Sequence, residues 1–392
     1  MMDEKNTTQS KKGDFLEVSV VLPCLNEEKT IGICIQKALE TLRKLNILGE
    51  VVVSDNGSTD NSVTIARSLG ARVVFQPRRG YGNAYLKGIE EAKGKYIIIA
   101  DSDNTYDLSD LEKFITPLRK DYDMVMGTRL KGTIMPSAMP WLHKYIANPF
   151  LSWFLNKLFK TGISDAHCGM RSFTKEAFHE MNLKTPGMEF ASEMVINASK
   201  SKLRIYEVPI TLYANKERTP HLRTFRDGWR HLCFMLLYSP DYLFLLPGAL
   251  FFLSGILGTF SIALYDIQIG KAHLGPNSMT FCCFLALLGI QIIFFGIIAK
   301  IFYSKSNPLF TLSNFMKRLI SLFTLESGIL TGLLLALSGF FIDAIIAYRW
   351  VKVNFGDLSW SEVRFALMAL VLLVVGIQII FSTFLLSILK ER

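Results

Sequence analysis

The sequence predicts two domains: an α/β domain with a Rossmann-like, mostly parallel sheet, followed by an all-α transmembrane domain of four helices. Up to about residue 238, short β-branched runs alternate with amphipathic helical stretches, which is typical of a doubly wound sheet. The remainder holds four long apolar runs with few charges, each long enough to cross a bilayer as a helix. With 392 residues, of which 50% are hydrophobic, the chain has room for both domains.

The predicted α/β domain covers residues 16–238 and follows a flexible N-terminal tail over residues 1–15. Its first strand is a β-branched run that stops at Pro23, as strands of a sheet often do. Helices are expected over residues 31–42, over 109–118 and from about 193 to 202, and residues 165–173 are expected to return to the sheet. The predicted strands cover residues 18–23, 50–54, 72–75, 96–100, 123–127 and 203–211.

The strand predicted at residues 96–100 is followed by Asp101-Ser102-Asp103, which marks the expected ligand-binding edge of the domain. Open α/β sheets bind ligands at the carboxyl ends of their strands. Two carboxylates two residues apart in an extended segment point the same way, so they could share one divalent cation with a substrate diphosphate. The motif alone leaves open an ordinary acidic turn or helix cap.

Two further loops are expected at the same edge of the sheet. Asp55 ends the second strand and precedes a turn at Gly57, which suits either a ligand contact or a plain strand-turn-helix joint. In residues 76–84, glycines allow close backbone approach, and Arg79 beside a helix terminus could hold a diphosphate. The dinucleotide fingerprint Gly-x-Gly-x-x-Gly is not completed here, and a plain loop fits equally well.

Charge and cysteine content limit the partners. The formal charge of +9 suits phosphate esters or anionic lipid headgroups, and nucleic acid is not expected because no nucleic-acid-binding motif accompanies it. The six cysteines lack paired metal-ligand spacing, so they are interpreted as buried apolar residues in a reducing compartment. Residues 1–13 lack the apolar core of a signal peptide, which predicts a cytosolic catalytic domain.

Two segments are expected to lie at a membrane surface. Residues 138–160 mix aromatic and basic side chains, and Pro149 is expected to break them into two short segments. A buried pair of core helices is the open alternative. The second segment covers residues 221–238, where arginines just before the first span would attract an anionic headgroup.

The membrane domain is predicted over residues 239–392, with spans at about 242–264, 279–303, 328–348 and 365–389. A cytosolic catalytic domain places six basic residues of the membrane domain on the cytosolic side and four on the opposite side, a modest bias in the direction of the positive-inside rule. The cytosolic set is Lys300, Lys305, Lys317, Arg318, Lys390 and Arg392, and the opposite set is Lys271, Arg349, Lys352 and Arg364.

Several motifs together resemble family 2 glycosyltransferases with the GT-A fold, over residues 16–238. They are Pro23-Cys-Leu-Asn26-Glu27-Glu28, Asp55-Asn-Gly-Ser-Thr-Asp60, Arg79-Gly-Tyr-Gly82-Asn83 and Asp101-Ser-Asp103. More narrowly, the chain is similar to polyprenyl-phosphate glycosyltransferases of the dolichol-phosphate mannose or glucose synthase group. The motifs that carry this narrower resemblance are Gly127-Thr-Arg129, Cys168-Gly-Met-Arg171 and the basic stretch from Arg218 to Arg223.

The resemblance implies roles for individual residues. Asp101 and Asp103 would bind Mg²⁺ or Mn²⁺ together with the diphosphate, and would be catalytic with Arg129 and Arg171. These two arginines would hold the acceptor phosphate, and Arg218 and Arg223 would close over the diphosphate or acceptor. The residues expected to bind the nucleotide sugar are Pro23, Asn26, Glu27, Asp55, Arg79, Gly82 and Asp101.

Two positions depart from the family pattern. Some relatives have Gln two residues after the second acid, where this chain has Thr105, so a third metal ligand from the protein is not expected there. The late basic motif of relatives, Arg-x-x-Gly-x-Ser-Lys, is here Arg218-Thr-Pro-His-Leu-Arg223, which weakens the assignment of these two arginines.

The expected reaction is inverting, metal-dependent sugar transfer from a nucleotide sugar to polyprenyl (undecaprenyl or dolichyl) phosphate at the cytosolic membrane face. UDP-glucose is favoured by analogy, with GDP-mannose and UDP-N-acetylglucosamine open. The protein would be a multi-pass integral membrane protein, in the plasma or inner membrane of a prokaryote, and a homo-oligomer is left open. One alternative is a processive polysaccharide synthase, although the Gln-x-x-Arg-Trp motif is missing: Arg349-Trp350 follows Ile346 instead. A non-catalytic membrane scaffold is the other.

Overall fold

The computed structural model divides into two compact units, which meet in sequence between Met235 and Leu236. It describes residues 16–215, 224–269, 272–307, 309–310, 312–322 and 324–391. The first unit carries a seven-stranded sheet and the second carries the apolar helices. Each unit is described by itself below.

The sheet has the strand order β3-β2-β1-β4-β6-β5-β7, and all neighbouring strands except those next to β6 pair in parallel. The predicted mostly parallel α/β sheet is therefore confirmed. The strands are β1 (Val18–Cys24), β2 (Gly49–Asp55), β3 (Arg72–Phe75), β4 (Tyr96–Ile99), β5 (Met124–Ile134), β6 (Arg171–Thr174) and β7 (Ile205–Leu212).

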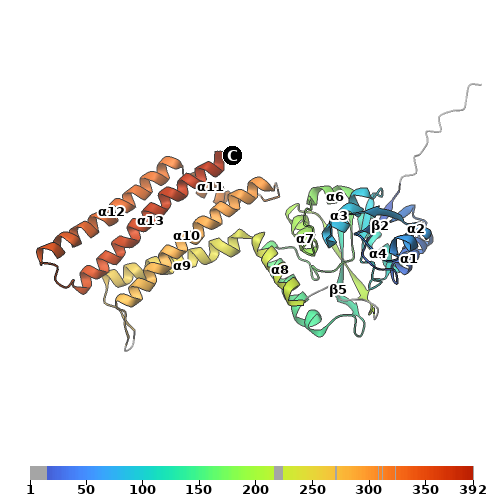
Figure 1. Cartoon of the computed structure of the whole chain (residues 1–392), viewed down its shortest axis with the longest axis horizontal. Coiled ribbons are helices and arrows are strands. Elements are labelled where there is room, and N and C mark those ends of the chain that lie inside the picture. Colours follow the sequence, from blue (N-terminus) through green and yellow to red (C-terminus); the bar gives the residue numbers. More distant parts are fainter. Residues whose placement is uncertain are drawn as a thin grey trace, which may run out of the picture. The chain divides into compact units, whose positions relative to one another are not determined.

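Helices cover both faces of the sheet (Figure 1). On one face, Ile35 and Phe114 belong to the same buried core as Val20 and Ile98. On the other face, helix α3 lies so close to β1 that a Cβ added at Gly88 would be 2.4 Å from Val21 Cγ1. The helices are α1 (Ile31–Lys44), α2 (Ser62–Ser68), α3 (Tyr81–Glu91), the 3₁₀ turn η1 (Leu108–Asp110), α4 (Leu111–Arg119), α6 (Lys175–Met181), α7 (Phe190–Lys200) and α8 (Thr224–Leu237).

The single antiparallel strand, β6, follows from the connection that precedes it. Between β5 and β6 the chain passes through a helical segment and then through His167 and Gly169, which line the candidate active-site cavity. It re-enters the sheet at Arg171, which pairs with Ile99 at the carboxyl end of β4 and with Met126 of β5. A chain that returns from this edge can only run opposite to its neighbours.

Residues 141–159 form one helical segment, made of a π-helical turn η2 (His143–Ala147) and helix α5 (Asn148–Phe159). The expected break at Pro149 is wrong. Proline lacks the N–H that an α-helix uses, and it sits in the first turn of α5 immediately after the wider π turn. The helix therefore continues through the proline and ends at Lys160, whose φ is 55°.

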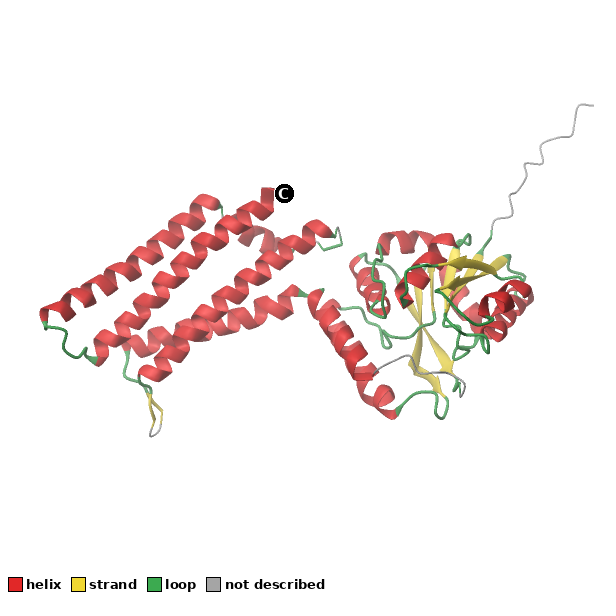
Figure 2. Ribbon diagram, in the orientation of Figure 1, coloured by secondary structure: helices red, strands yellow, loops and turns green. Residues whose placement is uncertain are grey.

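Among its described residues, the second unit contains four helices that are long and apolar enough to cross a membrane: Asp241–Leu264, Pro276–Ser306, Leu325–Lys352 and Trp360–Lys390 (Figure 2). This agrees with the four predicted spans. The elements are the π turn η3 (Asp241–Leu245), α9 (Leu246–Leu264), β8 (Gln268–Ile269), β9 (Ala272–His273), α10 (Pro276–Ser306), the short α11 (Asn314–Leu322), α12 (Leu325–Lys352) and α13 (Trp360–Glu391).

Small residues bring these helices together in pairs. A Cβ added at Gly289 of α10 would be 2.2 Å from the Phe252 backbone nitrogen of α9. Between α12 and α13, a Cβ at Gly376 would be 2.5 Å from both Gly332 O and Ala336 N. Close backbone approach over glycine is a common way for membrane helices to pack, because it increases van der Waals contact where lipid offers no hydrophobic driving force.

Candidate active site

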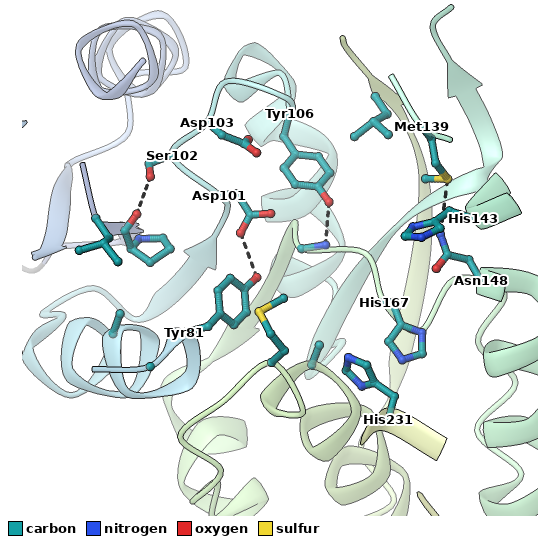
Figure 3. Close-up of a pocket in the computed structure, with 18 of the residues that line it drawn as sticks. Tyr81, Asp101, Ser102, Asp103, Tyr106, Met139, His143, Asn148, His167 and His231 are labelled. Carbon is teal, nitrogen blue, oxygen red and sulfur yellow. Dashed lines mark hydrogen bonds between the residues drawn. The ribbon is translucent and has the colours of Figure 1, made fainter. Parts of the chain in front are cut away.

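A cavity of about 490 Å³ opens at the carboxyl ends of β1 and β4 (Figure 3). Pro23 at the end of β1 and Asp101, Ser102 and Asp103 after β4 line one part of it. Another part is lined by histidines and by Arg129. The cavity therefore lies at the sheet edge that the sequence predicted for ligand binding.

Asp101 is held by two tyrosines from α3. The hydroxyls of Tyr81 and Tyr85 donate to the same carboxylate oxygen, Oδ1, at 2.9 Å and 3.1 Å. Burial and then the charge of Asp101 raise the pKa of both tyrosines well above the ordinary value, so both remain hydroxyl donors at neutral pH. A Cβ at Gly169 would be 2.6 Å from Asp101 Oδ2, so only glycine fits beside this carboxylate.

Asp103 is oriented by its own turn. Its Oδ1 accepts from the Thr105 backbone N–H at 3.1 Å and from the Thr105 hydroxyl at 2.6 Å. Its backbone carbonyl accepts from Asn215 Nδ2 at 2.7 Å, and the neighbouring Ser102 hydroxyl donates to Pro23 O at 2.5 Å. Thr105, which stands where some relatives have Gln, therefore orients a carboxylate.

The predicted nucleotide-binding residues divide into two groups. Pro23, Glu27 and Arg79 line the cavity. Asn26, which has a φ of 57°, lies outside the lining and accepts from the Thr59 backbone N–H at 2.8 Å. Asp55 also lies outside it and accepts from the N–H groups of its own turn, at 3.3 Å and 3.0 Å. These two residues shape the loops that carry the lining residues.

The glycines of the 76–84 loop make room for protein backbone. A Cβ at Gly82 would be 2.1 Å from Thr185 O, and the Asn83 backbone N–H donates to Pro186 O at 3.2 Å. A substrate diphosphate was expected to lie close to the backbone at these glycines. The backbone of residues 185–186 occupies that place. Gly82 does not line the cavity. The side chains that this turn contributes to the lining are those of Arg79 and Tyr81.

Asn56 is a lining residue that the sequence analysis missed. Its Nδ2 donates to Gln76 O at 3.0 Å and to Arg78 O at 2.9 Å, and its Oδ1 accepts from the Gly80 N–H at 2.8 Å. One side chain thus ties the end of β2 to the loop before α3. Its position beside Asp55 at a strand end is the signal that could have identified it.

Arg129 lines the cavity and is paired with a buried carboxylate. Its Nε and Nη2 donate to Asp165 Oδ2 and Oδ1 at 2.7 Å and 2.8 Å, and the Asp165 side chain is fully buried. Burial disfavours the charged guanidinium, but the charge of Asp165 and its hydrogen bonds outweigh this and raise the pKa of Arg129 further. Arg129 is a fixed positive charge beside the cavity.

Arg171 has different surroundings from those expected. It is 1% exposed and does not line the cavity. Its Nε, Nη1 and Nη2 donate to the carbonyls of Cys168, Ala191 and Ala166 at 2.8, 2.8 and 2.9 Å. Burial lowers the pKa of Arg171. In this structure the residue joins the 166–168 loop to α7, and it reaches the cavity only through Ala191, a lining residue whose carbonyl it holds.

Three histidines line the cavity and were not singled out from the sequence: His143, His167 and His231. His167 Nε2 lies 3.2 Å from Ser192 Oγ, which lies 2.9 Å from His231 Nδ1. Burial, then the charges of His231, Arg171 and Arg129, lower the pKa of His167 well below its ordinary value. The chain has six histidines, and no spacing among them indicated that three would meet here.

Helix α8 supplies the last side of the cavity. Arg226, Arg230 and His231 line it, and Arg230 Nε lies 2.8 Å from Glu189 Oε1 at the start of α7. Arg218 and Arg223, which were expected to close over the diphosphate or acceptor, lie outside the described residues.

Comparisons with known proteins agree on the class of enzyme. Residues 19–181 match the family described as glycosyl transferase family 2, and residues 297–390 match its C-terminal transmembrane region. The low-salt glycan biosynthesis hexosyltransferase Agl6 of Haloferax volcanii is 39% identical over 376 residues, which is 95% of this chain and 89% of that protein. A dolichyl-phosphate hexose transferase of the same organism is 30% identical over 215 residues, 55% of this chain and 90% of that protein.

One solved structure is that of glucosyl-3-phosphoglycerate synthase from Mycobacterium tuberculosis, in a complex with Mn²⁺, uridine diphosphate and glucosyl-3-phosphoglycerate. It is 23% identical to this chain, covers 57% of it and 79% of the solved chain, and has a TM-score of 0.46.

Proposed function

This chain belongs to glycosyl transferase family 2 and carries the C-terminal transmembrane region of that family, and from this premise we propose that it transfers a hexose from a nucleotide sugar to a polyprenyl phosphate. The acceptor would be undecaprenyl or dolichyl phosphate, and the product a lipid-linked sugar made at the cytosolic membrane face. The observation that carries the proposal is a single cavity lined by paired carboxylates in one part and by Arg129 and histidines in another.

The carboxylate part suits the donor. Among the described residues no group of three His, Cys, Asp or Glu side chains gathers as a metal site, but two carboxylates with substrate phosphates are a usual ligand set for Mg²⁺. Asp101 and Asp103 would hold Mg²⁺ or Mn²⁺, and the cation would stabilise the negative charge that builds on the departing diphosphate. Pro23, Glu27 and Arg79 line the same cavity and would contact the nucleotide.

The basic part suits an acceptor that is already an anion. A phosphate monoester needs no strong general base to act as a nucleophile; it needs to be positioned and partly desolvated. Arg129 supplies a fixed charge whose direction is set by Asp165, and burial lowers the pKa of His143 and His167, which line the same cavity. One acceptor oxygen would bond to the anomeric carbon as the bond to the nucleoside diphosphate breaks, which inverts the anomeric centre.

The names of two relatives support the substrate classes. Agl6 is named a hexosyltransferase and a second relative a dolichyl-phosphate hexose transferase, so a hexose and a polyprenyl phosphate are the first substrates to test. UDP-glucose is the favoured donor, followed by GDP-mannose and UDP-N-acetylglucosamine.

The helical segment at residues 141–159 would bring the catalytic unit to the membrane surface. Trp141 and Trp153 are 66% and 58% exposed, and Tyr145, Ile146 and Phe150 are exposed near them. Large aromatic side chains beside lysines suit the headgroup region of a bilayer. This placement would let a lipid acceptor reach the cavity without leaving the membrane.

The test is transfer of radiolabel from a panel of nucleotide sugars to a short polyprenyl phosphate, with Mg²⁺ or Mn²⁺ and then with chelator. One donor is expected to give labelled lipid that chelator abolishes. Asp101→Ala and Asp103→Ala are each expected to lower the rate by at least about a hundredfold. Asp110→Asn is the control, because Asp110 pairs with Lys113 outside the cavity and should leave the rate unchanged.

Three results would contradict the proposal. Label that appears only in a protein or a polymer would exclude the lipid phosphate acceptor. A product with retained anomeric configuration, or a glycosyl-enzyme adduct, would exclude direct displacement. Full activity in the presence of chelator would exclude the cation from the reaction.

A further inference from the structure

The hydroxyls of Tyr81 and Tyr85 converge on one oxygen of Asp101, a residue that the proposed function assigns to cation binding. The two tyrosines are four residues apart on α3, so their side chains lie on one face of the helix. Figure 3 shows the Tyr81 hydroxyl directed at the Asp101 carboxylate from the side of α3. Neither tyrosine was among the site residues expected from the sequence.

The tyrosine rings are themselves held in place. Their centroids are 4.9 Å apart in an edge-to-face arrangement, and the ring of Tyr85 stacks on Phe190 of α7 at 5.7 Å. Tyr85 is fully buried. The first turn of α3 is fixed by Asn83 N–H, which donates to Pro186 O. Both hydroxyls are therefore presented to Asp101 by a rigid helix end.

We infer that Tyr81 and Tyr85 are positioning residues that act through Asp101 to set how tightly the enzyme binds its divalent cation. Two donors on one oxygen fix the carboxylate in a single orientation before the cation arrives. A carboxylate free to rotate would lose that orientation, and binding the cation would then cost conformational entropy. Mutation of the hydrogen-bond partners of metal ligands typically costs about 10- to 100-fold in metal affinity or activity.

The measurement is Mn²⁺ binding to the full-length protein in detergent, followed by electron paramagnetic resonance, with and without inorganic pyrophosphate in place of the nucleotide diphosphate. Tyr81→Phe and Tyr85→Phe each remove one hydroxyl and keep the ring packing. Each is expected to weaken Mn²⁺ binding several-fold, and the double variant at least about tenfold. Raising the Mn²⁺ concentration is expected to restore the transfer rate of the double variant.

Tyr122→Phe is the control. Tyr122 does not line the cavity, and its ring packs on that of Tyr206 with the centroids 5.0 Å apart. Mn²⁺ affinity is expected to be unchanged in this variant. If it falls as much as in the double variant, or if the double variant binds Mn²⁺ like the wild type, the inference is overturned.

This inference rests on the proposed function, and the two can fail separately. Asp101→Asn is expected to weaken Mn²⁺ binding at least as much as the double tyrosine variant. If Asp101→Asn leaves Mn²⁺ binding unchanged, the cation site of the proposed function is wrong, and the tyrosines have no cation to position. If Asp101→Asn weakens binding but the tyrosine variants do not, only the role of the tyrosines is wrong.

Discussion

Arg129 and Arg171 show how two arginines near one cavity can be stabilised by opposite means. Arg129 stays charged and forms a two-point ion pair with a buried carboxylate, Asp165. Arg171 contacts three backbone carbonyls, whose dipoles compensate only part of its charge. The ion pair leaves the Arg129 guanidinium at the cavity wall. The hydrogen bonds of Arg171 hold the loop at residues 166–168 in place.

Replacing Asp165 by Asn is expected to destabilise the protein by about 3–5 kcal/mol, because it leaves the Arg129 charge buried without a counter-charge. The Arg129 side chain is only 11% exposed, so water can solvate the unpaired guanidinium only in part. The measurement is thermal unfolding of the full chain in detergent. Asp123→Asn is the control, since its partner Arg204 is 61% exposed, and such pairs contribute about 0–1 kcal/mol. Equal losses in both variants would contradict this account.

The position of a site residue relative to the cavity could be predicted where the neighbouring sequence determines it. Asp101 and Asp103 follow a buried strand, and the end of that strand puts them at the cavity. Arg171 was not predictable in the same way, because its partners Ala166 and Ala191 come from a loop and a separate helix. Its sequence neighbours indicate a strand start and do not show which way a guanidinium points.

Helix α8 makes polar contacts with α7 and with Glu189, the residue immediately before α7. Arg230 pairs with Glu189, and His231 Nδ1 lies 2.9 Å from Ser192 Oγ. His167, from the 166–168 loop, contacts the same serine. Three separate elements thus meet at one hydroxyl, and two of the three groups there are imidazoles.

Mild acid is expected to loosen this contact. Burial and the charges of His231, Arg171 and Arg129 lower the folded-state pKa of His167, so the unfolded chain takes up a proton at about pH 6.5 that the folded chain resists. The stability contributed by neutral His167 is complete above that pH and is lost as the pH falls through the lowered folded-state pKa.

The measurement is the thermal unfolding midpoint between pH 7.5 and 5.5, on the order of two pH units around the histidine range. His167→Gln is expected to flatten the decrease, because the glutamine amide cannot titrate. His179→Gln, at an exposed position on α6, should leave the slope of the wild type. A slope that stays unchanged in His167→Gln would assign the acid sensitivity to other groups.

Most elements were predictable from hydrophobic period and strand-end signals, but two features of their arrangement were not. The antiparallel direction of β6 depends on which edge of the sheet the chain re-enters from, and no local pattern near Arg171 shows this. The π turn before Pro149 depends on packing that lets a helix continue where proline normally interrupts it. Both are decided by contacts between elements.

The charges of the whole chain are distributed unevenly about its apolar helices. Lys317 and Arg318 lie on α11, between α10 and α12, and Lys390 is at the end of α13. Arg349 and Lys352 lie in the last turns of α12. The positive-inside rule then favours a cytosolic position for α11, which is also the orientation that the proposed cytosolic reaction requires.

Single cysteines in a chain whose native cysteines have been replaced would test this orientation. In intact cells a membrane-impermeant maleimide is expected to label Asp357→Cys, between α12 and α13, and to label Lys317→Cys only after permeabilisation. The reverse pattern would place α11 outside and would exclude transfer at the cytosolic face. Labelling of both positions in intact cells would show that the number of crossings between them is even.

At this scale hydropathy alone identified the four apolar helices, because a bilayer requires about 20 apolar residues per crossing. It did not identify their pairing. That depends on single glycines such as Gly289 and Gly376, whose close contacts with α9 and α12 leave no trace in average hydropathy.

The contact of Gly80 and Gly82 with the carbonyls of Pro186 and Thr185 also governs how this enzyme can be recombined with its relatives. A chimera that takes residues 80–82 from one parent and residues 185–186 from another would join two surfaces that were never selected together. Any side chain larger than hydrogen on one parent's turn would collide with the other's backbone. Residues 80–82 and 185–186 should therefore come from the same parent, and the crossover of a functional chimera should lie before residue 80 or after residue 186.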